Sequence, residues 1–248
     1  ESSLGIFSAV NNNGWTFGGG NQSAGNNFQF NGTNNYVSWT WRKAPQYFDI
    51  VTYSGDNVQG RAISHNLGSV PGMIWVKKTS HDEDWSVWHR DLHTNSSGDT
   101  TQFLKLNSNA AAFPPSPTSS SSATSDVRSA SSTTFTVGDD NRVNATGGTY
   151  VAYIFAHNNN DGIFGPDADQ DIIKCGVYTG DGQVDGPNID LGFEPQWLMF
   201  KSNSDSEDWF IVDSMREWTT DGKAAYIKPR FCLLYTSDAA DERSSVDL

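Results

Sequence analysis

The chain has 248 residues, enough for one or two domains that each bury a core. Its formal net charge of −13 would repel nucleic-acid phosphates, and no apolar run approaches the roughly 20 residues of a membrane-spanning helix. The sequence therefore predicts neither a nucleic-acid partner nor membrane insertion. Two cysteines are too few for a disulfide-held scaffold, and the first residues lack the basic and apolar regions of a signal peptide.

Alternation of large apolar residues with smaller ones predicts short strands along most of the chain. β-branched and aromatic residues fill these segments, and the Gly, Asn, Asp, Ser and Pro clusters between them are typical of turns. Only 214–218 favours a helical turn. We predict an all-β fold of antiparallel sandwich or barrel type. The expected strands are 36–41, 49–53, 73–77, 85–89, 102–106, 133–137 and 150–155.

Three blocks of sequence recur in the same order later in the chain. The offset is 125 residues for the first block and 124 for the other two, too long for solenoid repeats and suited to tandem domains. The recurring pairs are YSGD at 53–56 with YTGD at 178–181, 67–77 with 191–201, and DWSV at 84–87 with DWFI at 208–211.

The N-terminal region belongs to the same series, because YVSWTW at 36–41 matches YVAYIF at 150–155 at an offset of 114. We therefore expect tandem β-sandwich units of which both terminal ones are truncated. Since each partial unit would leave strand edges unpaired, the two halves are candidates to pair with each other. The expected divisions are a closing part at 1–47, a complete unit at 48–157, an exposed linker at 158–170 and an opening part at 171–231.

The final segment, 232–248, changes character abruptly and has no counterpart elsewhere in the chain. It resembles the conceptual translation of transposon-type sequencing-adapter DNA. We therefore expect 232–248 to be non-native, which leaves Cys175 as the one native cysteine; the alternative is a natural acidic tail.

Each copy of the Leu-Gly-x-x-Pro block predicts a hairpin with a long tip. Gly permits a tight turn, and Pro, which lacks an N–H, begins a strand without losing a ladder hydrogen bond. The strands agree between the copies while the tips, 78–84 and 202–208, differ. Variable loops on a constant scaffold are typical of binding surfaces, so the two tips are candidates to determine binding specificity. The Pro- and Ser-rich segment 107–132 predicts a surface loop, with a variable contact loop as the alternative.

Asp167, Asp169 and Asp171 follow one another at alternate positions, a spacing that suits carboxylate ligands of Ca²⁺. The EF-hand pattern would then require Gly at the sixth position and Glu at the twelfth, where this sequence has Ile172 and Tyr178. The EF-hand motif is therefore absent. An irregular calcium site and a solvated acidic linker both remain as interpretations, and no other cofactor is predicted.

The nine tryptophans suggest carbohydrate binding, because flat aromatic faces stack on sugar rings while carboxylates orient hydroxyl groups. The candidate residues are Trp75, Trp88, Asp84 and Asp208. The competing interpretation places the tryptophans in the core, since Trp85 recurs as Trp209 as a fixed large residue of each unit.

The acidic run at 81–85 also suggests a glycosidase, in which paired carboxyl groups act as acid and base. Asp84 and Asp208 align between the two copies, more simply as residues that end a turn. We therefore predict no catalytic site and no enzymatic activity.

Four segments, 39–78, 84–92, 135–182 and 189–201, resemble repeat domains in virion structural proteins of marine tailed phages. The resemblance covers roughly 1–231 and implies a tail-fibre or appendage protein with jelly-roll, lectin-like sandwiches. It assigns no catalytic residue.

We therefore expect a structural or adhesive protein of the virion, an extracellular particle. Its expected partners are other virion proteins and host-surface polysaccharide, and a homotrimer is a further expectation. The alternative is a carbohydrate-binding module of a secreted polysaccharide-degrading protein, and a glycoside hydrolase is a third interpretation.

Overall fold

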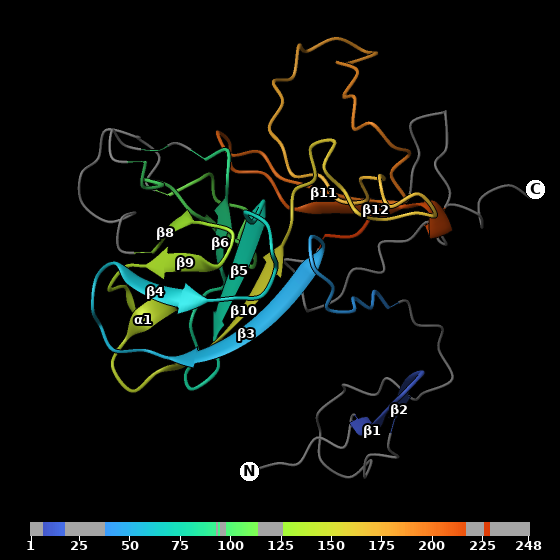
Figure 1. Cartoon of the computed structure of the whole chain (residues 1–248). Helices are drawn as coiled ribbons and strands as arrows, with labels where there is room; N and C mark the ends of the chain where they lie inside the picture. Colours follow the sequence, from blue (N-terminus) through green and yellow to red (C-terminus); the bar gives the residue numbers. More distant parts are fainter. Residues whose placement is uncertain are drawn as a thin grey trace, which may run out of the picture. The chain divides into compact units, whose positions relative to one another are not determined.

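The computed structural model describes residues 7–17, 38–92, 94, 98–113, 126–216 and 226–228 (Figure 1). The chain divides into two compact units, Glu1–Trp41 and Arg42–Leu248. In the first, β1 (Phe7–Asn11) and β2 (Gly14–Phe17) form an antiparallel hairpin. Its turn residues, Asn12 and Asn13, are of the type that two-residue hairpin loops favour.

The second unit contains a five-stranded sheet in which every neighbouring pair is antiparallel. Its strand order is β3-β10-β5-β6-β7, so the last strand of the set in sequence lies between β3 and β5 (Figure 1). The strands are β3 (Phe48–Ser54), β5 (Met73–Lys78), β6 (Ser86–His89), β7 (Leu104–Lys105) and β10 (Thr149–Phe155).

A three-stranded antiparallel sheet packs against the first, in the order β4-β9-β8. Its strands are β4 (Arg61–Ser64), β8 (Val127–Ala130) and β9 (Thr134–Val137). A single turn of helix, α1 (Asn141–Asn144), follows β9. The side chain of Asp140 caps this turn by accepting a hydrogen bond from the backbone N–H of Arg142.

The core lies between the two sheets. On β10, Tyr150, Ala152 and Ile154 point inward and are fully buried, as the period of two requires of a strand with one core face. They meet Phe135 and Val137 of the opposite sheet in one apolar cluster. Burial of each large apolar side chain contributes about 1.5–3 kcal/mol. The all-β sandwich fold predicted from the sequence is confirmed.

A further hairpin follows this sandwich within the same unit. It consists of β11 (Trp197–Phe200) and β12 (Phe210–Asp213), and the 3₁₀ turn Ser214–Arg216 comes directly after it (Figure 1). Its Trp209 indole N–H donates to the backbone carbonyl of Lys105, 2.8 Å away, so the hairpin contacts the sandwich beside β7.

Several sequence expectations need correction. The described part of 36–41, residues 38–41, forms no strand, and residues 36 and 37 lie outside the described residues. Segment 107–132 is more than a loop, because it contains β8 with its buried Val127. The linker is exposed only in part. Asn158 is buried and its side chain accepts hydrogen bonds from two backbone N–H groups, those of Ile172 and Ile173.

The tail 232–248 lies outside the described residues. In the parts of the chain that the structure describes, no helix combines the length and apolar character needed to cross a bilayer.

Candidate functional site in a repeated hairpin

The β5–β6 hairpin and the β11–β12 hairpin have the same register. Each residue pair of the second lies 124 residues after its counterpart in the first, which is the offset of the sequence repeat. The outermost pairs are Met73 with His89 and Val76 with Ser86 in the first hairpin, and Trp197 with Asp213 and Phe200 with Phe210 in the second. The recurring sequence blocks therefore specify one recurring supersecondary structure.

A short third segment extends both copies. In the first, β7 pairs with β6, and in the second, Ile227 forms a β-bridge with Ile211 of β12. The sequence FLK at 103–105 corresponds to YIK at 226–228. This correspondence is not recognisable in the sequence, because three residues are too few to align until strand pairing places them together.

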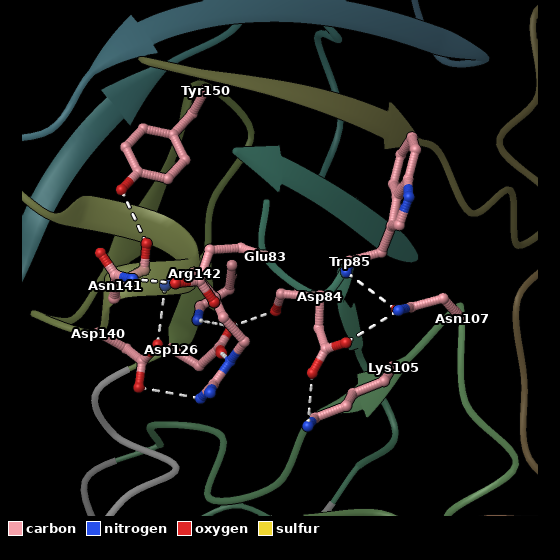
Figure 2. Close-up of polar contacts among 12 residues, drawn as sticks. Glu83, Asp84, Trp85, Lys105, Asn107, Asp126, Asp140, Asn141, Arg142 and Tyr150 are labelled. Carbon is pink, nitrogen blue, oxygen red and sulfur yellow. Dashed lines mark hydrogen bonds and ion pairs between the residues drawn. The ribbon is translucent and has the colours of Figure 1, made fainter. Parts of the chain in front are cut away.

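The two predicted aspartates each form an ion pair with a lysine of this third segment. The carboxylate of Asp84 lies 2.7 Å from Lys105 Nζ (Figure 2). In the second copy, the carboxylate of Asp208 lies 3.0 Å from Lys228 Nζ. Both pairs connect the start of the second hairpin strand to the segment beside it. Since they are partly exposed, each contributes at most about 1 kcal/mol to stability.

In the first copy, Asn107 adds hydrogen bonds to the pair. Its Nδ2 donates to Asp84 Oδ1 at 2.8 Å, and its Oδ1 accepts from the backbone N–H of Trp85 at 3.1 Å (Figure 2). Partial burial raises the pKa of the Asp84 carboxyl, but the hydrogen bonds and charge of Lys105 and the bond from Asn107 outweigh it. The pKa is therefore lowered overall.

A lysine that recurs in both copies fastens the hairpin tip. Lys77 Nζ donates to the backbone carbonyl of Glu83, at the far end of the first tip. The equivalent Lys201 donates to the carbonyls of Ser202 at 2.5 Å and Asp205 at 3.1 Å. A lysine at this position thus satisfies carbonyl groups of both tips although their sequences differ.

The first tip is connected to α1 through side chains. Asn141 of α1 donates its Nδ2 to the carboxylate of Glu83 (Figure 2). Its Oδ1 accepts a hydrogen bond from Lys78 Nζ at 2.6 Å. The Tyr150 hydroxyl donates to the backbone carbonyl of Asn141 at 2.9 Å. Glu83, which the glycosidase interpretation would use as an acid or base, therefore has a structural partner.

Behind the tip lies a buried carboxylate, Asp126, which accepts hydrogen bonds from Ser86 Oγ and, at 3.2 Å, from Arg142 Nε. Burial raises its pKa, and the charge of Arg142 opposes this without cancelling it. The same guanidinium pairs with Asp140 at 2.9 Å and lies 4.5 Å from the ring centre of Phe103. This arrangement joins β6, the residue directly before β8, and α1, and is therefore structural.

The structure places the two predicted sugar-stacking tryptophans in the interior. Trp75 is 9% exposed and packs on Phe155, and Trp88 is 5% exposed with its indole N–H donating to Thr100 Oγ1 at 2.7 Å. Neither ring face is open to a sugar, so these two residues are removed from the candidate site. Both tryptophans are buried because apolar side chains cover both faces of the five-stranded sheet at β5 and β6.

The recurring tryptophans, in contrast, differ between the copies. Trp209 is buried, whereas Trp85 is only half-buried and lies 5.9 Å from the ring of Tyr153. The partly exposed cluster of the first copy therefore consists of Asp84, Trp85, Lys105 and Asn107 (Figure 2). We refer to these four residues as the tip cluster.

The predicted calcium ligands do not converge. Both carboxylate oxygens of Asp171 accept backbone N–H groups, from Asn160 at 2.7 Å and Gly162 at 2.8 Å, while Asp167 and Asp169 are exposed. Among the described residues, no three His, Cys, Asp or Glu side chains are grouped as metal ligands. Asp171 thus closes a loop, and we propose no metal site there.

Neither a curated protein nor a solved structure matches the chain significantly. A family model described as "Domain of unknown function (DUF7483)" matches residues 1–243. Because this match covers nearly all of the sequence, the chain belongs to that family.

Proposed function

We propose that this protein is a modular structural component of an extracellular particle, the virion of a tailed phage, with hairpin tips as its contact surfaces. One observation carries the proposal: the hairpin recurs with an unchanged register and an unchanged aspartate–lysine pair, while its tip changes sequence. A constant framework with variable loops suits a protein that spaces contact points along its length. The virion is proposed as the particle because the sequence resembles virion structural proteins.

Mass spectrometry of purified particles tests this proposal. Virions banded on a density gradient should contain peptides of the chain in a constant ratio to the major capsid protein. An antiserum to the chain should also label intact particles in electron micrographs. Peptides found in infected cells but missing from banded particles would refute the virion role.

The tip cluster favours a second activity, the binding of a neutral glycan. Trp85 offers a partly open indole, and Asp84 and Asn107 offer a carboxylate and an amide beside it. An aromatic surface with a few converging polar groups is what sugar recognition requires. This activity supports either an adhesive virion protein or the alternative, a carbohydrate-binding module.

Glycan-array binding of the chain and its variants tests this activity. We expect Trp85→Ala to reduce binding at least tenfold. Asp208→Asn is the matched control, because Asp208 belongs to an equivalent ion pair whose neighbouring Trp209 is buried. Equal loss in both variants, or no bound glycan on a broad array, would refute glycan binding at the tip cluster and leave the structural role.

A further inference from the structure

β3 lies at one end of the five-stranded sheet, so a strand pairs with only one of its edges. Its inner edge pairs with β10, and the described part of the chain places no strand along its outer edge. The sequence of β3, FDIVTYS, is rich in β-branched and aromatic residues. A strand of this composition with an open edge is a template for pairing with another chain. What occupies the outer edge of β3 therefore decides whether copies associate there.

Both ends of this outer edge are closed by neighbouring residues of the same chain. Alternate residues of an edge strand direct their backbone groups outward. At Phe48, both backbone groups bond to Ala44, whose N–H donates at 3.0 Å and whose carbonyl accepts at 3.1 Å. At Ser54, the guanidinium of Arg61 donates to the backbone carbonyl. Residues before and after β3 thus cover the first and last outward positions.

The middle of the outer edge is covered by an ion pair between Lys43 and Asp49, whose charged atoms lie 2.6 Å apart. Lys43 Nζ donates to the backbone carbonyl of Ile50 at 3.1 Å, and Asp49 Oδ1 accepts from the backbone N–H of Ile50 at 2.9 Å. The N–H of Asn66 donates to Asp49 Oδ2 at 2.7 Å and fixes the carboxylate. Two side chains therefore occupy both backbone groups of Ile50 and place a positive charge at the edge.

Thr52 is the remaining outward position of β3. Outside the sheet, its backbone N–H and C=O bond to no described residue, and its side chain is exposed. Strand addition gains affinity from a run of backbone hydrogen bonds. One open residue offers too short a run, but Thr52 and an uncovered Ile50 would together offer two successive outward positions.

We propose that Lys43 closes the outer edge of β3 against addition of the same edge of a second copy. Without its ammonium group, the carbonyl of Ile50 would be open beside Thr52, and β3 of another copy could pair antiparallel about a two-fold axis. In the unaltered chain, repulsion between the two lysines of such a pair opposes the contact further. This inference depends neither on the virion role nor on glycan binding.

Sedimentation of the full chain over a range of concentrations tests the role of Lys43. Lys43→Met keeps an unbranched side chain but uncovers the carbonyl of Ile50, and we expect its association constant to exceed that of the unaltered chain at least tenfold. Asp49→Asn is the matched control, because it also breaks the ion pair but retains the lysine at the edge. Equal association of both variants would refute the proposal, since lost stability would then explain it. A Lys43→Met variant that associates no more than the unaltered chain would also refute it.

A second substitution locates the contact. Thr52→Pro removes the outward N–H of Thr52, and edge strands tolerate proline at such a position. The double variant Lys43→Met, Thr52→Pro should sediment as the unaltered chain does, with its circular dichroism spectrum retained. Association that persists in the folded double variant would place the contact elsewhere and overturn the assignment to the outer edge of β3.

Discussion

Removal of one hydroxyl group from the core should measurably destabilise the sandwich. The Tyr150 side chain is 1% exposed, and its hydroxyl donates to the carbonyl of Asn141 at 2.9 Å and accepts from the N–H of Ala145 at 2.8 Å. These bonds hold both ends of the α1 turn against β10. Tyr150→Phe deletes them and leaves the ring, so packing changes little.

Two lost hydrogen bonds at about 0.5–1.5 kcal/mol each give a decrease of about 1–3 kcal/mol in the free energy of unfolding. For a domain of this size the melting temperature should fall by about 2–4 °C per kcal/mol. Urea unfolding followed by tryptophan fluorescence measures the change. An unchanged slope of the unfolding free energy against urea concentration would show that the denatured state is the same.

Two further tyrosines provide graded controls. Tyr53 stacks on Tyr150 at 5.2 Å and its hydroxyl makes a single bond, to the carbonyl of Val143 at 2.8 Å, so Tyr53→Phe should cost about half as much. Tyr153 lies on the opposite face of β10, and Tyr153→Phe should cost less than about 0.5 kcal/mol. Equal effects of all three substitutions would refute the assignment of the cost to the α1 turn.

Three other predictions concern single positions. Burial raises the pKa of the Asp49 carboxyl, but its bonds with Lys43 and Asn66 lower it overall. Its stabilisation is therefore present above the unfolded-state pKa and is lost as pH falls through the lower folded-state pKa. The stability deficit of Asp49→Asn in urea titrations should be full at about pH 7 and shrink as the pH falls below the unfolded-state value of about 3.9. Gly55→Ala would place a Cβ 2.1 Å from the carbonyl oxygen of Ala145 and should lower the free energy of unfolding by about 1–3 kcal/mol, and a neutral result would contradict this close approach. Burial raises the pKa of the Cys175 thiol to about 12, so iodoacetamide at about pH 8 should label Cys175 on the order of a thousandfold more slowly in the native chain than in the unfolded chain, as followed by mass spectrometry of the peptide that contains Cys175.

The local pattern of the sequence was sufficient to predict most strands of the large sheet. In 150–155, the alternation of residues predicts which side chains enter the core, and Tyr150, Ala152 and Ile154 do so. The recurring Leu-Gly-x-x-Pro block likewise predicts the two hairpins. These inferences succeed because turn chemistry and a period of two are properties of neighbouring residues.

Strands without such a pattern were missed. β4, with the sequence RAIS, and β8, with VRSA, contain few β-branched residues and follow or interrupt loop-like sequence. β4 and β8 become strands because each pairs with β9. β9 also carries Phe135 and Val137, which pack in the core of the sandwich. Tertiary contacts, which a local pattern does not contain, decide such cases.

The candidate site divides in the same way. Sequence comparison of the two copies was enough to single out Asp84 and Asp208 as equivalent, but their lysine partners lie about twenty residues further on and are aligned only by strand pairing. Burial of a tryptophan was not predictable either, since it depends on what covers each face of a sheet. The sequence by itself determined an antiparallel β chain with a repeated hairpin. The tertiary structure alone decided the placement of β10 between β3 and β5, because long-range packing sets strand order.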